Sequence, residues 1–145
     1  MRARQVYESI HFTRTGDSKS SLGVGKKALI DQWFATWAPY VDYDVDEDFN
    51  IHVEEDLDLR NTRIECHSLP DTDNLSVKGY LDLTYTKITS LPNNLSVGRN
   101  LYLQRSRITS LPDNLRVRGH LDLRGTKITS LPDNLSVGGK IYKDF

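Results

Sequence analysis

The sequence predicts a repeat solenoid, a β-solenoid stack of parallel short strands with a helical cap at its N-terminal side. One sequence motif occurs four times in succession, in coils that span residues 57–80, 81–100, 101–120 and 121–140. The last three coils are each twenty residues long, and coils 81–100 and 121–140 agree at 15 of 20 positions. Self-similarity at a fixed short period is typical of stacked coils in which every residue column repeats along one axis.

Composition narrows the classes of protein that this chain can represent. The chain has 145 residues and a net charge of −1, which does not favour nucleic acid or an anionic membrane as a partner. Cys66 is the single cysteine, so an internal disulfide is excluded and a reducing compartment is compatible. The sequence has neither a membrane-length apolar run nor the apolar stretch of a secretion signal. We therefore expect a cytoplasmic protein that stays outside membranes.

Six apolar columns predict the core. Each coil opens with Leu-x-Leu, and this alternation points both leucines to one side of a short strand. Stacked coils then bury a continuous core that no single coil could bury alone. The columns are Leu57, Leu81, Leu101 and Leu121; Leu59, Leu83, Leu103 and Leu123; Ile64, Ile88, Ile108 and Ile128; Leu69, Leu91, Leu111 and Leu131; Leu75, Leu95, Leu115 and Leu135; Val77, Val97, Val117 and Val137.

Small and hydroxyl side chains predict the turns between strands. A glycine corner precedes each Leu-x-Leu strand, and a positive φ is expected there because glycine adopts it at little cost. Prolines fix φ on the side of the coil that has no sheet. A hydroxyl column can bond neighbouring backbone because a hydroxyl both donates and accepts. The columns are Gly79, Gly98, Gly119 and Gly138–Gly139; Pro70, Pro92, Pro112 and Pro132; Thr62, Thr86, Ser106 and Thr126.

The repeat L-x-L-x-x-T-x-I-T-S-L-P-x-N-L-S-V-G-G resembles the short, twenty-residue bacterial type of leucine-rich repeat, especially the versions in gut bacteria and their tailed phages. The resemblance covers residues 57–140. It departs in placing threonine or serine where leucine-rich repeats carry asparagine, so both a curved arc and a nearly straight solenoid stay open. The segment VYESIHFTRTGDSKSSLGVGKKALIDQWF also resembles a leader on small tailed-phage proteins. Both resemblances imply a phage-encoded protein.

The ends of the solenoid are expected to differ. Segment 1–48 should carry a capping helix at about 24–38, ended by Pro39, while the solenoid itself occupies 49–145. The helix should cover the first coil with one apolar face, made of Ala28, Leu29, Trp33, Phe34 and Trp37. The partial last strand, 141–145, is expected to have an open edge that invites pairing with another copy or an assembly.

Three local motifs are weak evidence for chemistry. The stretch GVGKK lacks the spacing of a phosphate-binding loop. The alternating aspartates of DYDVDEDFN lack the glycine and the glutamate of a calcium loop, and a solvated acidic connector is expected there instead. Cys66 and His67 fall short of a zinc pattern because no second pair follows them. We expect no enzyme activity, no cofactor and no metal.

The outward positions of the Leu-x-Leu strands form the candidate binding surface. Aromatic, Asp, Arg and His side chains vary there from coil to coil, as in protein-binding surfaces, where Tyr and Arg are favoured anchors. A merely solvated sheet face is the alternative, because outward strand residues are polar by default. The candidate residues are Asp58, Arg60, Tyr80, Asp82, Tyr102, Gln104, His120, Asp122, Arg124 and Tyr142.

A second column is wholly basic. This basic ladder consists of Arg63, Lys87, Arg107 and Lys127. Like charges at strand spacing repel unless an anion answers them, so either solvated side chains or an anionic partner would explain it. The favoured function is a non-enzymatic protein-interaction module that binds a protein partner through the strand face. The alternatives are a structural component of a virion or assembly, and nucleic-acid binding through the basic ladder.

Overall fold

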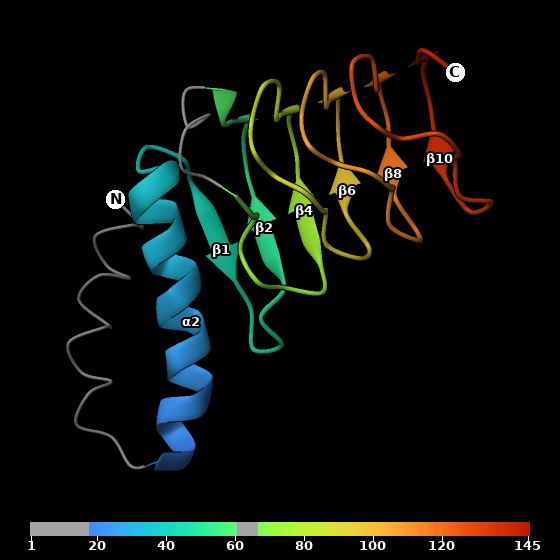
Figure 1. The fold of residues 1–145 in the computed structure, drawn as a ribbon. Coiled ribbons are helices and arrows are strands. Elements are labelled where there is room, and N and C mark those ends of the chain that lie inside the picture. The colour runs from blue at the N-terminus through green and yellow to red at the C-terminus, as the bar shows by residue number, and fades with distance from the viewer. Residues whose placement is uncertain (1–17, 61–66) are drawn as a thin grey trace.

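The computed structural model is a parallel-strand β-solenoid with an N-terminal helix, which confirms the predicted fold class (Figure 1). It describes residues 18–60 and 67–145, and of residues 18–24 the backbone alone. The helix is α2 (Ser18–Trp37). The strands are β1 (Tyr43–Val45), β2 (Ile51–Val53), β3 (Leu57–Asp58), β4 (Leu75–Val77), β5 (Leu81–Asp82), β6 (Ser96–Val97), β7 (Leu101–Tyr102), β8 (Arg116–Val117), β9 (Leu121–Asp122), β10 (Ser136–Val137) and β11 (Ile141–Tyr142).

Each coil contributes one strand to each of two sheets. The six-stranded sheet has the order β1-β2-β4-β6-β8-β10, and the five-stranded sheet has the order β11-β9-β7-β5-β3. All neighbours pair in parallel except β1 and β2, which form an antiparallel hairpin. Because equivalent residues pair from coil to coil, an outward position in one coil lies beside the same position in the next.

The predicted apolar columns fill the space between the sheets. Leu81, Leu101 and Leu121 are fully buried, as are their partners two residues later. Among the described residues, burial is incomplete in the last coil, where Leu131, Leu135 and Val137 are half-buried. Ile64 lies outside the described residues. Replacing one fully buried leucine by alanine would cost about 2–5 kcal/mol, which shows how firmly these columns fix the register.

The helix packs on the N-terminal side of the stack beside β1 (Figure 1). It begins at Ser18, earlier than expected. Ile30 and Phe34 form its inward row, which continues to Ala38 directly after the helix. Phe34 stacks on Tyr43 with ring centroids 3.8 Å apart. The prediction for Leu29 is wrong: it is 66% exposed, because it lies one residue off the row at spacing i, i+4 that faces the core.

A buried polar group joins the helix to the hairpin. The Asp31 side chain accepts a hydrogen bond from the Tyr43 hydroxyl at 2.9 Å and pairs with Lys27 at 3.0 Å. Burial, and then the Asp31 charge, raise the pKa of Tyr43. Tyr43 therefore stays a neutral donor, and the buried carboxylate has the partners that a buried charge requires.

The corner glycines serve a different purpose from the predicted one. Within the described part of the chain, Gly125 is the glycine with a positive φ (76°), and it does not lie at the corner. At the corner, a Cβ on Gly98 would collide with the carbonyl oxygen of Lys78, and one on Gly138 with that of Arg118. Glycine is needed there because the backbones of consecutive coils approach closely, not because of φ.

Left-handed backbone occurs elsewhere in the coil. Tyr85, Arg105 and Gly125 share one column, with φ between 56° and 76°, and Asn94 and Asn114 share another, at 58° and 62°. Asparagine tolerates this conformation better than most residues. In coils 81–100 and 101–120, the side that has no strand is thus closed by two tight turns that the sequence pattern did not indicate.

The hydroxyl column behaves as predicted. Thr86, Ser106 and Thr126 each donate a hydrogen bond of 2.7 Å to the carbonyl oxygen of the leucine three residues earlier. Thr62 lies outside the described residues. An asparagine ladder runs beside the six-stranded sheet, where Asn134 donates to Asn114 at 2.9 Å and Asn114 to Asn94 at 3.1 Å. The hydroxyl bonds are local, because donor and acceptor lie three residues apart in one coil. The asparagine bonds instead join consecutive coils, and both kinds satisfy polar groups within the protein.

Candidate interaction surface

The five-stranded sheet gathers the candidate binding residues into one row. Its outward positions are in register from β3 to β11, so Asp58 pairs with Asp82, Asp82 with Tyr102, Tyr102 with Asp122, and Asp122 with Tyr142. Strands in a sheet lie about 4.8 Å apart, so this row forms one continuous surface. The other candidates flank it at the two ends of each strand.

The aspartates of the row close the turns that follow their strands. Asp58 accepts a hydrogen bond from the backbone N–H of Arg60 at 3.0 Å, and Asp82 accepts one from that of Thr84 at 3.0 Å. Asp122 does the same for Arg124 at 3.2 Å. These carboxylates are therefore committed to the fold, and Asp82 and Asp122 are buried.

Arginine neutralises the same aspartates. Arg60 grips Asp58 with two donor nitrogens, at 2.9 and 2.5 Å, and its Nε also lies 3.4 Å from Asp82. Arg124 grips Asp122 in the same way, at 2.9 and 2.6 Å. The side-chain hydrogen bond from Arg60 lowers the pKa of Asp58, and the partner aspartates raise the pKa of both arginines. Both arginines of this face are thus neutralised by aspartates of the same face.

Aromatic rings occupy the gaps between these ion pairs. Tyr80 and Tyr102 meet edge to face with centroids 6.1 Å apart, and His120 and Tyr142 do so at 6.0 Å. The Arg124 guanidinium lies 5.3 Å from the Tyr142 ring centroid. Burial raises the pKa of Tyr80. Such edge-to-face pairs are worth about 0.5–1.5 kcal/mol each, which favours the orientation that each ring has in the structure.

Side chains at the corner also fix the backbone of the next coil. Asn100 accepts a hydrogen bond from the backbone N–H of His120 at 2.7 Å and donates one to the Tyr102 hydroxyl at 2.7 Å. His120 Nδ1 accepts from the backbone N–H of Lys140 at 2.8 Å, which places the ring proton on Nε2. His120, predicted as a binding residue, therefore also has a structural contact.

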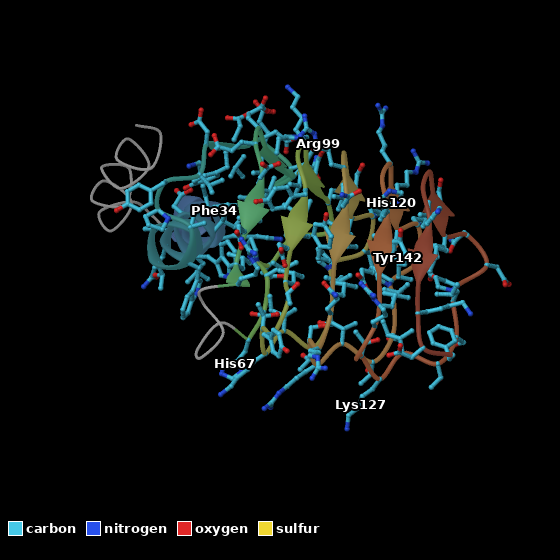
Figure 2. The ribbon with its side chains drawn as sticks, turned by 90° about the horizontal axis from the view of Figure 1, so that it is seen from above. Phe34, His67, Arg99, His120, Lys127 and Tyr142 are labelled. Atoms are coloured by element: carbon cyan, nitrogen blue, oxygen red, sulfur yellow. The ribbon has the colours of Figure 1, made fainter. Side chains whose placement is uncertain are left out.

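The basic ladder lies on a different side of the molecule. Lys87, Arg107 and Lys127 belong to the segments that leave the five-stranded sheet, and Figure 2 shows Lys127 at one long edge. Arg107 and Lys127 are exposed, and none of the three forms an ion pair with a residue that the structure describes. Arg63 lies outside the described residues. The ladder and the candidate binding row are separate surfaces.

A second basic row, which the sequence analysis missed, follows the opposite edge, where Figure 2 places Arg99. This corner row consists of Lys78, Arg99, Arg118 and Lys140, one for each coil. Its members were missed because they do not share one position of the twenty-residue frame, since arginine or lysine alternates with the corner glycine. Counting charge per corner instead of per column would have found it.

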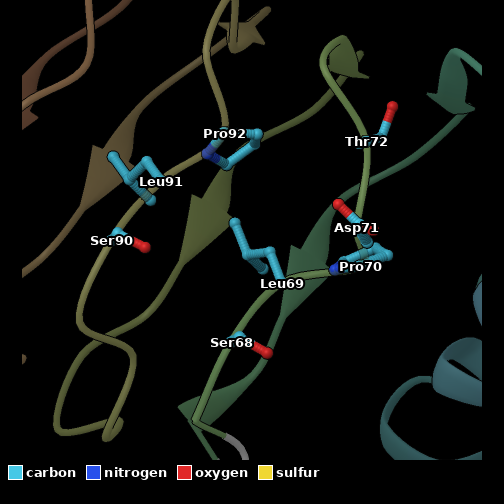
Figure 3. A pocket seen from close by; sticks show the side chains of 8 residues that line it. All are labelled: Ser68, Leu69, Pro70, Asp71, Thr72, Ser90, Leu91 and Pro92. Carbon is cyan, nitrogen blue, oxygen red and sulfur yellow. The ribbon is translucent and has the colours of Figure 1, made fainter.

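The hollow in Figure 3 does not bring reactive groups together. It measures about 270 Å³ and is lined by Ser68, Leu69, Pro70, Asp71, Thr72, Ser90, Leu91 and Pro92. The Thr72 hydroxyl is already used, because it donates to the Phe49 carbonyl at 2.7 Å and accepts from the backbone N–H of Asn74 at 3.2 Å. Hydroxyl, leucine and proline side chains make up most of its lining, and Asp71 is its single titratable side chain.

The three local motifs take other roles. GVGKK forms part of α2 rather than a loop. Asp46, from the alternating aspartates, caps the hairpin turn by accepting hydrogen bonds from the backbone N–H groups of Asp48 and Asn50, which lower its pKa together with the side chain of Asn50. Among residues 18–60 and 67–145, no group of three His, Cys, Asp or Glu side chains is placed to hold a metal ion.

The alternation in DYDVDED marks a strand rather than an irregular connector. Tyr43 is buried in β1 and Asp44 is exposed, as expected for a strand with one inward face. The described part of the chain contains no helix that is long and apolar enough to span a membrane. Comparison with protein-family models, with curated proteins and with solved structures found no match to this chain.

Proposed function

We propose that this protein is a non-enzymatic interaction module that binds a protein partner through the outward face of the five-stranded sheet. The observation that carries the proposal is the contrast between the constant inward columns and the outward row. The row changes from Asp to Tyr between coils, whereas the frame that holds it repeats. A sheet face that only contacts solvent needs polar side chains and nothing more. The edge-to-face aromatic pairs on this face therefore favour a binding role.

Preorganisation supports this reading. Association costs free energy for every rotamer-rich side chain that has to be immobilised, about 0.5–1.5 kcal/mol each. Here Arg60 and Arg124 are already held by aspartates, and Tyr102 and Tyr142 by neighbouring rings. Tyrosine and arginine are also the residue types that most often anchor interfaces. A partner would therefore meet a surface that loses little entropy on binding.

The finer features of the proposal rest on the repeat and leader resemblances. They favour a phage-encoded protein that acts in the cytoplasm of a bacterial host. A structural role in a virion or assembly is the second candidate, favoured by the same resemblances to tailed-phage proteins. Nucleic-acid binding would use the basic ladder and would weaken steeply with salt.

An affinity pull-down from bacterial cells tests the favoured function. The variant Y80A/Y102A/Y142A removes the ring pairs of the surface and leaves the aspartate-capped turns intact. The matched control, T89A/T109A/T129A, truncates three exposed threonines on the side that carries the basic ladder. We expect a partner that the wild type and the control retain and the tyrosine variant loses, with unchanged circular dichroism for all three. Equal retention by all three proteins would exclude the face.

Two further measurements separate the alternatives. Mass spectrometry of purified particles would detect a virion component and miss a cytoplasmic module. Nucleic-acid association would have to fall steeply between low and high salt and to weaken on substitution of Lys87, Arg107 and Lys127. Salt-independent binding would contradict it.

A further inference from the structure

Charge is segregated along this chain to a degree that the net charge of −1 hides. Residues 31–73 contain thirteen acidic and two basic residues, whereas residues 74–145 contain eleven basic and five acidic residues. Because the coils stack in sequence order, the N-terminal side of the solenoid is acidic and the remaining coils are basic. A molecule whose net charge is close to zero has little repulsion to keep its copies apart.

The six-stranded sheet carries this segregation on its outward face. Its outward residues are in register in the order Asp44, His52, Ser76, Ser96, Arg116 and Ser136. An acidic residue thus stands on β1, small serines stand in the middle, and arginine stands on β8. Serines leave the centre of the face flat, so that a second surface can approach it closely.

The corner beside this sheet repeats the pattern. After β2 come Glu54 and Glu55, both exposed, and the later coils bring the basic corner row. The acidic residues and the first members of the row enclose a hollow of about 270 Å³, lined by Glu54, Glu55, Asp56, Lys78, Gly79 and Arg99. Lys78 pairs with Glu54 at 2.8 Å.

The remaining cations of this surface are not held in ion pairs with the described residues. Arg99, Arg116, Arg118 and Lys140 are exposed, and within the described residues none of them makes an ion pair. This contrasts with the five-stranded sheet, where Arg60 and Arg124 are each neutralised. Unanswered cations at one end of a face and exposed carboxylates at its other end point to a partner with the reverse order of charges.

We propose that two copies of this chain associate face to face through the six-stranded sheet, with their strand orders antiparallel. A two-fold axis parallel to the strands, between β4 and β6, reverses the strand order and keeps the corners on the same side. It places Ser76 opposite Ser96, the corner carboxylates Glu54 and Glu55 opposite Arg118, and Asp44 near Arg116 of the second copy. Symmetry makes each contact twice, which is the usual arrangement of homodimers.

A second copy fits this face better than a polyanion does. A nucleic acid or another uniformly anionic polymer would gain from the basic coils but would be repelled by Asp44, Glu54 and Glu55. A second copy uses both halves of the pattern. Like charges come close at the centre, where Lys78 meets Arg99, but Lys78 already has Glu54 as a neighbour. Opposite charges on an interface mainly set orientation and partner choice.

Sedimentation velocity on the full chain at low salt tests the dimer. Two variants each reverse the charges at one end of the face, and the two are then mixed. The variant R116E/R118E makes both ends acidic, and D44K/E55K makes both ends basic. We expect the wild type at twice the 16.6 kDa monomer mass and each variant alone as a monomer. An equimolar mixture of the two should return to the dimer. The control, K87E/K127E, changes the net charge by the same amount as R116E/R118E but on the basic ladder, and it should stay dimeric.

Each contrary result has a clear meaning. A monomeric wild type at low salt overturns the dimer. Dissociation of the control to the same extent as R116E/R118E would assign the effect to net charge and not to this face. A dimer that persists in R116E/R118E would place association elsewhere, for example at the β10–β11 end. Circular dichroism shows whether each variant keeps its fold. The milder variant R116A/R118A introduces no new charge and should raise the dissociation constant at least tenfold.

Discussion

The corner glycines offer the sharpest test of what sets the spacing between coils. The N–H of Gly98 donates to the Val77 carbonyl at 2.7 Å, and a Cβ at Gly98 would run into the carbonyl oxygen of Lys78. The substitution Gly98→Ala therefore forces backbone against backbone. Gly125→Ala is the matched control, because Gly125 has the positive φ of 76° and its closest obstacle is the flexible Arg105 side chain, at 2.7 Å.

The two substitutions should differ in cost. Overpacking a well-packed site typically costs about 1–3 kcal/mol. Gly98→Ala belongs at the upper end because the Lys78 carbonyl lies between those of Val77 and Gly79, which are both fixed by hydrogen bonds from the next coil. At Gly125 the left-handed conformation costs alanine about 1–2 kcal/mol. A stiffer unfolded chain returns about 0.4–1 kcal/mol in both variants, so this gain cancels in the comparison. We therefore expect Gly98→Ala to be more destabilising than Gly125→Ala by about 1–2 kcal/mol.

Urea unfolding followed by circular dichroism gives both free energies from the midpoint and the slope. Equal losses, or a larger loss for Gly125→Ala, would refute close approach as the reason for the glycine corner. The result would then favour φ, the reason that the sequence pattern alone suggests.

Two further substitutions test the polar ladders. Thr86→Val keeps the shape of a buried side chain and removes its 2.7 Å bond to the Leu83 carbonyl, so the free energy of unfolding should fall by about 1 kcal/mol in urea titration; an unchanged value would mean that the ladder adds nothing. The pKa of Asp58 is lowered below 3.8 in the folded protein, so its contribution is present above that pH and is lost as the pH falls through the folded pKa. Asp58→Asn should therefore flatten the acid limb of a plot of melting temperature against pH, and an acid limb identical to that of the wild type would contradict this.

The repeat predicts the frame well because the core is a property of columns. A leucine at a position that recurs every twenty residues has the same neighbours in every coil, so one alignment assigned the inward side chains of the coils wherever the structure describes them. The helix was harder, since Leu29 and Ile30 are adjacent and equally apolar. The stacking of Phe34 on Tyr43 of β1 decides between them, because Ile30 lies four residues before Phe34 on the same helix face.

Features that depend on contact between coils were not predictable in the same way. The close approach at Gly98 involves the carbonyl of Lys78, twenty residues earlier, and the sequence records only the absence of a side chain. The alternating aspartates of the hairpin strand β1 predicted a solvated connector. The single inward Tyr43 was too weak a signal to indicate a strand. The corner row escaped detection because its charges shift by one or two positions between coils.

The two sheets differ in how far their electric fields reach, and this separates their proposed roles. On the five-stranded sheet, Arg60 and Arg124 are neutralised by aspartates two residues away, so a partner meets shape and aromatic surface with little net field. On the six-stranded sheet, acidic and basic groups stand several strands apart, at or beyond the Debye length of about 8 Å at physiological salt. Added salt should therefore weaken association through the six-stranded sheet and leave partner binding through the five-stranded sheet nearly unchanged. If both respond equally to salt, the division of roles between the sheets is wrong.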